Sequence, residues 1–422
     1  MIIKRYAFKE IADHLLAREI TILIGPRQVG KTTIMEALRE QVEKMAMPYI
    51  WFNLDVESDA GWFASQETLR SKVGLEFNKK PGVVFIDEIQ RKADAGRFLK
   101  GLYDTLPDVK FVVSGSGSLE LKEHIVESLA GRKRMFEILP ISFYELVDFK
   151  TAYRYSDRLL NFLDLHSDER LSFLSEHLSF GGYPKVVLAE TANEKQRILL
   201  EIMSSYLNRD ISAITAIAKK ADYNQLLRLL AVQVGSVISY SQLSQSVTIT
   251  SQTVKDYLWY MVHTFMIRLS LPFFRNATKE ITKAPVGYFV DLGMSNQLSM
   301  QGQLIQDVSQ HGLLFQNWVF NELLFLFRND FVELKHWRTT DKAEVDIMLE
   351  WGSIAFPVEV KTSANYHSQI SRSFRSFLQK YKPPQAFVVS RTPAWQLKVE
   401  DTQVYGIPFY QLPRIRNVIL EK

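Results

Sequence analysis

Short apolar blocks alternate with longer amphipathic stretches over the first 150 residues. Each block has the length and the continuous apolar character of a strand that is buried on both faces. The blocks are TILI (21–24), YIWFNL (49–54), GVVFID (82–87) and KFVVSG (110–115). The stretch TTIMEALREQVEKM, between the first two blocks, has helical spacing instead. Strands that alternate with helices predict an α/β domain over residues 1–150, built on a parallel sheet with helices on both faces.

The pattern changes three times after residue 150. Residues 151–221 are helical and polar, which predicts a helical lid or linker. Residues 222–280 contain three helical stretches followed by the strand-like MIRLSLPFF, a pattern typical of a winged-helix domain. Residues 281–422 mix strands and helices, and VDIML and FPVEV flank a WGS turn as a hairpin would. We therefore expect four domains.

Composition narrows the class of protein. The 422 residues are 46% hydrophobic and 23% charged, the mix of a globular protein, and the absence of cysteine excludes disulfides and thiolate metal sites. A net charge of +4 is too small to indicate nucleic acid by itself. The start lacks the features of a secretory signal, and polar residues interrupt the longest apolar stretch, 313–327. We expect a cytoplasmic protein with access to ATP and Mg²⁺ and no membrane partner.

A phosphate-binding motif follows the first predicted strand and opens the first long helix. Its glycines allow backbone N–H groups to face phosphate oxygens, the lysine can reach the β- and γ-phosphates, and the threonine hydroxyl can bind Mg²⁺. The pattern G-x-x-x-x-G-K-[ST] is matched by Gly25, Pro26, Arg27, Gln28, Val29, Gly30, Lys31 and Thr32, with Thr33 next to it. The sequence therefore predicts an ATP site at residues 25–33.

Two acidic residues end the third predicted strand. Asp87 is expected to hold the magnesium shell, and Glu88 to orient and deprotonate the attacking water. Ser114, at the end of the next strand, can sense the γ-phosphate or can belong to a Gly/Ser turn. Arg132 and Arg134 are candidates for an arginine finger, in cis or across a subunit interface, or are solvated basic residues. Together with the phosphate loop, the acids predict hydrolysis rather than binding alone.

Five motifs in order, GPRQVGKTT, FIDEIQR, VVSGSGS, SLAGR and LPISFYEL, resemble bacterial and archaeal AAA-type ATPases that carry a C-terminal DUF4143 domain. The resemblance covers nearly the whole chain. It implies Walker A roles for Lys31 and Thr32, Walker B roles for Asp87 and Glu88, and a sensor-like role for Ser114. One departure, Gly117 among the serines of SGSGS, leaves the sensing side chain ambiguous.

The third helix of the predicted winged helix begins with polar residues that can contact phosphates or base edges. They are Ser251, Gln252, Thr253 and Lys255. Because only one of them is basic, the pattern leaves two partners open, DNA and a protein.

The C-terminal hairpin carries a second candidate site. Glu359 and Lys361 share a strand face, Asp346 can join them from the partner strand, and Glu322 can approach from a helix beneath. The spacing D-x₁₂-E-x-K resembles the PD-(D/E)XK nuclease core, which implies catalytic roles for all four residues and metal binding by Asp346 and Glu359. The alternative is a solvated ion pair without catalysis.

These features predict a Mg²⁺-dependent ATPase that couples hydrolysis to DNA binding or processing. The alternative is a nucleotide-controlled switch that binds a protein partner and has an inactive nuclease-like domain. A third hypothesis, ATP as a structural ligand only, conflicts with Glu88. The sequence leaves the oligomeric state open.

Overall fold

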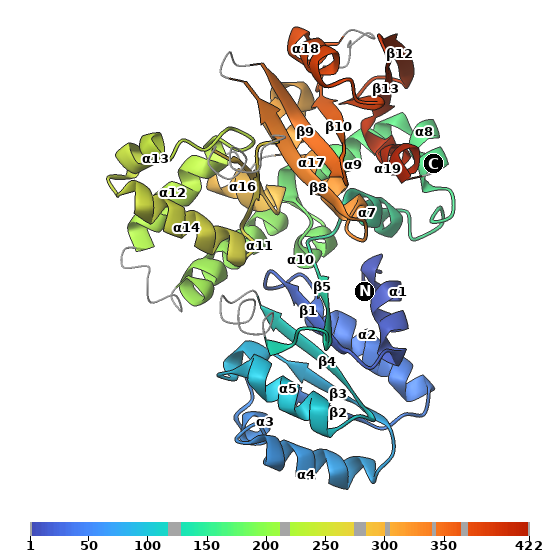
Figure 1. The fold of residues 1–422 in the computed structure, drawn as a ribbon, viewed down its shortest axis with the longest axis vertical. Helices are drawn as coiled ribbons and strands as arrows, with labels where there is room; N and C mark the ends of the chain where they lie inside the picture. The colour runs from blue at the N-terminus through green and yellow to red at the C-terminus, as the bar shows by residue number, and fades with distance from the viewer. Residues whose placement is uncertain are drawn as a thin grey trace.

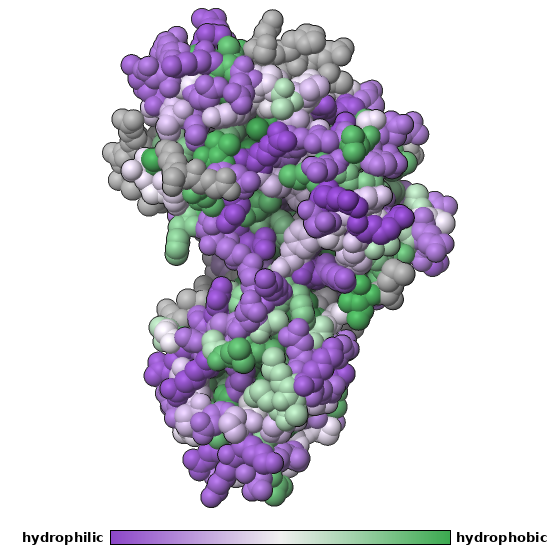
Figure 2. Space-filling view, turned by 90° about the vertical axis from the view of Figure 1, so that its right-hand side faces the viewer, coloured by the Kyte–Doolittle hydropathy of each residue, from purple (hydrophilic) through white to green (hydrophobic). Residues whose placement is uncertain are grey.

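A computed structural model describes residues 2–116, 128–211, 220–273, 284–299, 304–339, 343–363 and 370–420. The chain forms two lobes (Figure 1), and Figure 2 shows the narrower waist between them from the side. The N-terminal lobe holds the phosphate-loop motif. The other lobe contains the described helices and strands from α7 (Phe143–Lys150) onward.

A five-stranded parallel sheet forms the centre of the N-terminal lobe, in the order β2-β3-β4-β1-β5. The strands are β1 (Ile20–Gly25), β2 (Tyr49–Asn53), β3 (Gly82–Asp87), β4 (Val109–Ser116) and β5 (Lys133–Glu137). The first four agree with the predicted apolar blocks. The fifth was not predicted, because KRMFE lies at the sheet edge and buries only Phe136.

Helices cover both faces of this sheet, as predicted for an α/β domain. On one face, α1 (Ala7–Asp13) and α2 (Lys31–Lys44) pack against Leu23, Phe85 and Val112. On the other face, α4 (Gln66–Phe77) and α5 (Ala95–Thr105) pack against Ile22, Ile86 and Val113. The short α3 (Glu57–Gly61) follows β2. Alternate residues of each strand point to opposite faces, so the continuous apolar blocks satisfy both helical layers.

The middle of the chain is helical. Its first part comprises α7, α8 (Leu159–Leu165), α9 (Ser167–Phe180), α10 (Pro184–Leu188), α11 (Ala192–Ser205) and a π-helical turn at Tyr206–Asp210. Ser142 caps α7 in a capping box with Glu145, so this helix begins directly after the segment that leaves the N-terminal lobe.

Three helices and a strand follow, in the order that the pattern predicted, and a further strand completes a two-stranded sheet. They are α12 (Lys220–Val232), α13 (Tyr240–Val247), α14 (Ser251–His263), β6 (Ile267–Ser270) and β7 (Val286–Phe289). Ser239 caps α13 by accepting a hydrogen bond from Gln242 N–H. β7 pairs with β6, and α16 (Leu292–Leu298) packs against α9, α11 and α12. Residues 286–298 therefore pack with the helical region, and the domain limits at 151, 222 and 281 stay predictions.

The last part of the chain is a six-stranded mixed sheet in the order β12-β13-β11-β10-β9-β8. Its elements are α17 (Gly312–Leu326), β8 (Val332–Arg338), β9 (Glu344–Trp351), β10 (Ile354–Val360), α18 (Arg372–Tyr381), β11 (Gln385–Ser390), β12 (Trp395–Val399), β13 (Thr402–Pro408) and α19 (Pro413–Leu420). The predicted hairpin is present, because Trp351 pairs with Ile354 across a two-residue turn in which Gly352 has φ 60°.

Helix α17 explains the long apolar stretch at 313–327. Its buried residues occupy every side of the helix, because the C-terminal sheet covers one side and the middle helices cover the others. Within the described parts of the chain, none of the helices combines the length and apolarity needed to cross a bilayer.

Candidate nucleotide site

The phosphate loop leaves the carboxyl end of β1 and enters α2 with the backbone that the motif requires. Gly25 has φ 153°, and a Cβ there would lie 2.0 Å from the carbonyl oxygen of Ile138. Gly30 has φ 94° and forms the N-cap of α2, and Gln28 is also left-handed, with φ 63°. Side chains at the two glycines would collide or be strained, so the loop geometry depends on them.

The Lys31 side chain folds back onto the phosphate loop. Lys31 is buried, and its Nζ donates hydrogen bonds to the carbonyls of Gly25 (3.0 Å) and Pro26 (2.7 Å). The Lys31 ammonium therefore lies against the first two residues of its own loop. The neighbouring positions vary in burial: Arg27 and Thr33 are half-buried and Gln28 is exposed.

Asp87 links strands β3 and β4 to the start of helix α2. Thr32 Oγ1 donates to Asp87 Oδ2 at 2.8 Å, joining the phosphate loop to the end of β3. Ser114 on β4 donates to Asp87 Oδ1, and the backbone N–H of Glu88 donates to the same oxygen at 3.1 Å. The structure thus brings together the predicted magnesium pair, Thr32 and Asp87, with the predicted sensor. The side chain of Ser116 and residue Gly117 lie outside the described set.

Glu88 leaves the sheet in a left-handed conformation, with φ 58° and ψ 41°. A non-glycine residue adopts this conformation at a cost, and such residues concentrate at functional sites. The Glu88 carboxylate accepts a hydrogen bond from Gln90 Nε2, a partner that the sequence did not suggest. Gln90 thereby orients the predicted water-activating residue.

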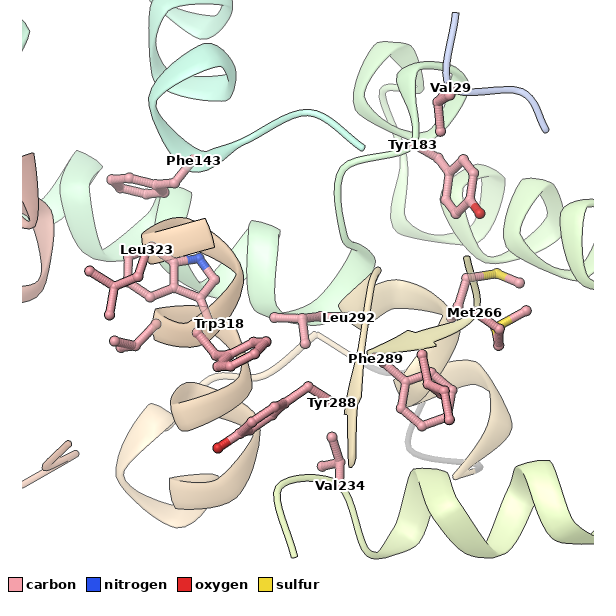
Figure 3. Packing of buried hydrophobic residues seen from close by; sticks show 14 of the residues in the cluster. Val29, Phe143, Tyr183, Val234, Met266, Tyr288, Phe289, Leu292, Trp318 and Leu323 are labelled. Atoms are coloured by element: carbon pink, nitrogen blue, oxygen red, sulfur yellow. The ribbon is translucent and has the colours of Figure 1, made fainter. Parts of the chain in front are cut away.

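A turn from the helical region closes one side of the phosphate loop. Val29 and Tyr183 are buried in the same apolar cluster, and Figure 3 shows them side by side. A Cβ at Gly30 would lie 4.0 Å from Pro184 Cγ. The sequence of this turn is GGYP, residues 181–184, and it lies within the stretch predicted as a helical lid or linker. The signal available was its paired glycines followed by Tyr-Pro within an otherwise helical, polar stretch.

Hydrogen bonds and close backbone contacts hold this turn in place. Gly182 O accepts from Ile141 N–H at 2.7 Å, and Gly182 N–H donates to Asp291 Oδ2 at 2.7 Å. Burial raises the pKa of Asp291 to about 6, while the N–H groups that it accepts from act in the opposite direction. Asp291 precedes α16, so one carboxylate both caps that helix and fixes the turn.

Arg132 lies at the opposite edge of the sheet. Its backbone carbonyl accepts from Ile20 N–H at the start of β1, and its guanidinium pairs with Asp104 at 2.9 Å. The six residues of β1 separate this edge from Gly25 by about 16 Å. Arg134 is paired with Thr21, near the same edge. The cis arginine finger is therefore corrected: neither residue lies at the phosphate loop of its own chain.

Three of the four predicted C-terminal residues do come together. Lys361 Nζ lies 2.9 Å from Glu359 Oε1, and Asp346 Oδ2 accepts from Val360 N–H at 2.7 Å. Burial raises the pKa of Asp346 to about 7, and the nearby Glu359 adds to the shift. Glu359 Oε2 is buried and has no hydrogen-bond partner among the described residues. Among those residues there is no group of three or more His, Cys, Asp or Glu suited to a metal ion.

Glu322 does not join them, which corrects the expected four-residue cluster. Its carboxylate accepts from Phe143 N–H at 2.9 Å and lies 4.0 Å from His177 Nδ1, on the side of α17 that faces the helical region. Burial raises its pKa to about 8. Because α17 is buried on all sides, spacing alone did not reveal which side carries Glu322.

The predicted reading residues lie at the start of α14. Ser251, Gln252 and Lys255 are exposed and Thr253 is half-buried, with Thr250 as the N-cap. Lys255 Nζ lies 5.4 Å from the centre of the Tyr240 ring. This face therefore presents polar groups and one cation to solvent.

Three family models match separate parts of the chain. Residues 17–147 match an AAA domain, residues 172–304 match a domain of unknown function, DUF8612, and residues 311–410 match DUF4143. The expectation of an AAA-type nucleotide-binding domain followed by a DUF4143 domain is confirmed at this level.

Curated relatives extend along most of the chain. An uncharacterized protein of Methanocaldococcus jannaschii is 27% identical over 329 residues, which cover 75% of this chain and 71% of that protein. An uncharacterized protein of Mycobacterium tuberculosis is 26% identical over 381 residues, covering 90% of this chain and 78% of that protein.

Two solved structures resemble parts of the chain only distantly. A katanin structure solved for its self-assembly has a TM-score of 0.26 and 19% identity, and covers 36% of this chain and 57% of that chain. AMPPCP-bound DnaA from Aquifex aeolicus has a TM-score of 0.30 and 13% identity, and covers 62% of this chain and 89% of that chain.

Proposed function

We propose that this chain is a Mg²⁺-dependent ATPase. The observation that carries the proposal is the 2.8 Å hydrogen bond between Thr32 Oγ1 and Asp87 Oδ2. A hydroxyl and a carboxylate held together beside a phosphate loop are the oxygen ligands that Mg²⁺ takes in nucleotide hydrolases. The left-handed Gly30 and the buried Lys31 next to them fit a triphosphate.

Each residue of the site has a role in this proposal. Loop N–H groups and Lys31 hold the phosphates, and Thr32 and Asp87 hold the metal, which would neutralise charge on the phosphate oxygens. Glu88 orients the attacking water and accepts its proton, and Gln90 positions Glu88. Ser114 donates a hydrogen bond that fixes the orientation of the Asp87 carboxylate, so a movement of that carboxylate changes the Ser114 contact.

We further propose that hydrolysis is coupled to DNA through residues 222–280, the region with the predicted pattern of a winged helix. Polar residues at the exposed start of α14 support this coupling. A nucleotide-controlled switch that binds a protein partner is the alternative, since the face offers only one lysine, Lys255.

Turnover of ATP, measured with and without DNA over a range of salt concentrations, tests both proposals. Stimulation by DNA that declines steeply with salt supports coupling to DNA. Slow turnover that DNA does not change favours the switch. Absence of any Mg²⁺-dependent turnover, with retained folding, contradicts the ATPase itself.

A second candidate function, cation-dependent cleavage of DNA, rests on the C-terminal cluster. Glu359 Oε2 is buried without a hydrogen-bond partner in the described part of the chain, and Asp346 and Lys361 lie beside it. Carboxylate oxygens are the ligands that a hard divalent cation prefers. Incubating plasmid with Mg²⁺ or Mn²⁺ tests it. Nicking by the wild-type chain that Asp346→Ala abolishes supports cleavage, and uncut plasmid with both proteins contradicts it.

A further inference from the structure

A cation from the extreme N-terminus contacts the phosphate loop from behind. Arg5 lies outside residues 17–147, the part of the chain that matches an AAA domain. Its Nη1 donates to the carbonyl of Val29 at 3.0 Å, within the phosphate loop. Its Nη2 donates to the carbonyl of Leu139 at 2.6 Å, in the segment that follows β5. The Arg5 guanidinium therefore joins the phosphate loop to residues 138–142, the segment that leaves the sheet and is called the strap below.

The direction of the Val29 carbonyl sets the direction of the next N–H group. In a trans peptide the C=O of one residue and the N–H of the next point in opposite directions. Arg5 holds the Val29 carbonyl on the outer side of the loop, so the Gly30 N–H is turned toward the inner side. Inward N–H groups are what such a loop offers to phosphate.

Glu145 keeps the Arg5 guanidinium in place. Arg5 Nε lies 3.2 Å from Glu145 Oε1, and the two side chains are 9% and 1% exposed. Glu145 Oε1 also accepts from Tyr6 N–H at 2.7 Å, and Glu145 Oε2 accepts from Ser142 N–H at 3.0 Å. Glu145 neutralises the charge of the Arg5 guanidinium, and both Glu145 oxygens are held by backbone N–H groups. Arg5 therefore has little freedom to release the Val29 carbonyl.

We propose that Arg5 is a positioning residue for the nucleotide, which it serves by orienting the Val29–Gly30 peptide toward the phosphates. This inference rests on the proposed ATP binding. The contact is a charge-assisted hydrogen bond to a loop carbonyl, and its loss frees the peptide to rotate. Arg5 does not contact the reacting atoms, so its effect falls on nucleotide affinity first and on kcat second.

The test compares three variants by calorimetric titration with Mg-ADP and with a non-hydrolysable ATP analogue. Arg5→Ala is expected to weaken nucleotide affinity about 10- to 100-fold, the effect of one charge-assisted hydrogen bond. Arg5→Lys keeps the positive charge but loses the planar guanidinium that donates to two carbonyls at once, and it should retain part of the affinity. Arg18→Ala, an exposed arginine at the other edge of the sheet, should bind as the wild type does.

Further readouts separate positioning from simple stabilisation. Millimolar guanidinium should restore affinity to Arg5→Ala and leave the wild type unchanged. If Arg5→Ala does not fold, Arg5→Lys alone decides, through a higher KM with kcat nearly kept. Affinity within twofold of wild type in the folded Arg5 variants overturns the role of Arg5 alone. A wild-type chain that binds neither nucleotide overturns the proposed function as well.

Discussion

Glu322 and Phe143, 179 positions apart in the chain, are joined by a 2.9 Å hydrogen bond from the Phe143 N–H to Glu322 Oε1. The Phe143 ring also lies edge-on to Trp318, which is on α17 like Glu322 (Figure 3); the two ring centres are 5.3 Å apart. Phe143 follows residues 138–142, and Ile138 N–H donates to Ile24 O beside the phosphate loop at 2.7 Å. The strap formed by residues 138–142 thus connects helix α17 of the C-terminal part to the candidate nucleotide site.

The first prediction concerns the protonation of Glu322. Burial raises the pKa of its carboxyl from 4.5 to about 8, so the folded state binds this proton over a range in which the unfolded state releases it. The protonated Glu322 carboxyl makes its whole contribution to the free energy of unfolding below pH 4.5. This contribution is lost as the pH rises through 8, by at most about 1.4 kcal/mol per pH unit. Glu322→Gln should remove this dependence.

Urea unfolding at pH 5.5, 7 and 8.5 measures this effect. The stability of Glu322→Gln relative to wild type should rise with pH. The raised pKa values of Asp346 and Asp291, about 7 and about 6, act equally in both proteins and cancel in the difference. Glu333→Gln, an exposed glutamate, is the control. A difference that stays constant across the three pH values contradicts the assignment.

The second prediction concerns the phosphate contact. Lys31→Ala should abolish nucleotide binding, because the loop loses its only lysine and two hydrogen bonds to its own carbonyls. Lys44→Ala, at the exposed end of the same helix, should bind normally. Fluorescent-nucleotide titration distinguishes the two. Equal nucleotide affinity in both variants would show that Lys31 does not contact the phosphates.

The third prediction separates binding from hydrolysis. Glu88→Gln should retain ATP but turn it over at least about 100-fold more slowly, since an amide cannot accept the proton from water. Glu57→Gln, an exposed glutamate on α3, should leave turnover unchanged. Single-turnover assays with filter binding report both quantities. Normal hydrolysis by Glu88→Gln would show that another group activates the water.

Local pattern was enough to predict which residues the candidate site brings together, because they sit at the ends of strands that the apolar blocks mark. Thr32, Asp87 and Ser114 meet because the carboxyl ends of parallel strands share one edge. The same rule would have placed Arg132 had β5 been recognised. A residue that precedes a parallel strand lies at the other edge.

Long-range packing was not available from pattern. Arg5 reaches Val29 and Leu139 across 24 and 134 positions, and no periodicity marks such a contact. Glu322 was predicted to join Asp346 and Glu359 because its helix was expected to lie beneath the hairpin. The side of a helix that is apolar all round is decided by which neighbours cover it, and this becomes visible only in three dimensions.

The last prediction sets two glycine substitutions against each other. A Cβ at Gly182 would lie 2.1 Å from Ile141 O and 2.7 Å from Ile141 N, which are backbone atoms of the strap. They cannot move without disturbing the Ile141–Gly182 hydrogen bond, so Gly182→Ala should destabilise the protein by about 1–3 kcal/mol and weaken nucleotide binding.

A Cβ at Gly74, within helix α4, meets nothing within 4 Å. Gly74→Ala should therefore stabilise the protein by about 0.5–1 kcal/mol through helix propensity and leave binding unchanged. Thermal unfolding with and without nucleotide measures both effects, and a Gly182→Ala variant as stable as the wild type would mean that the turn does not pack against the strap in solution.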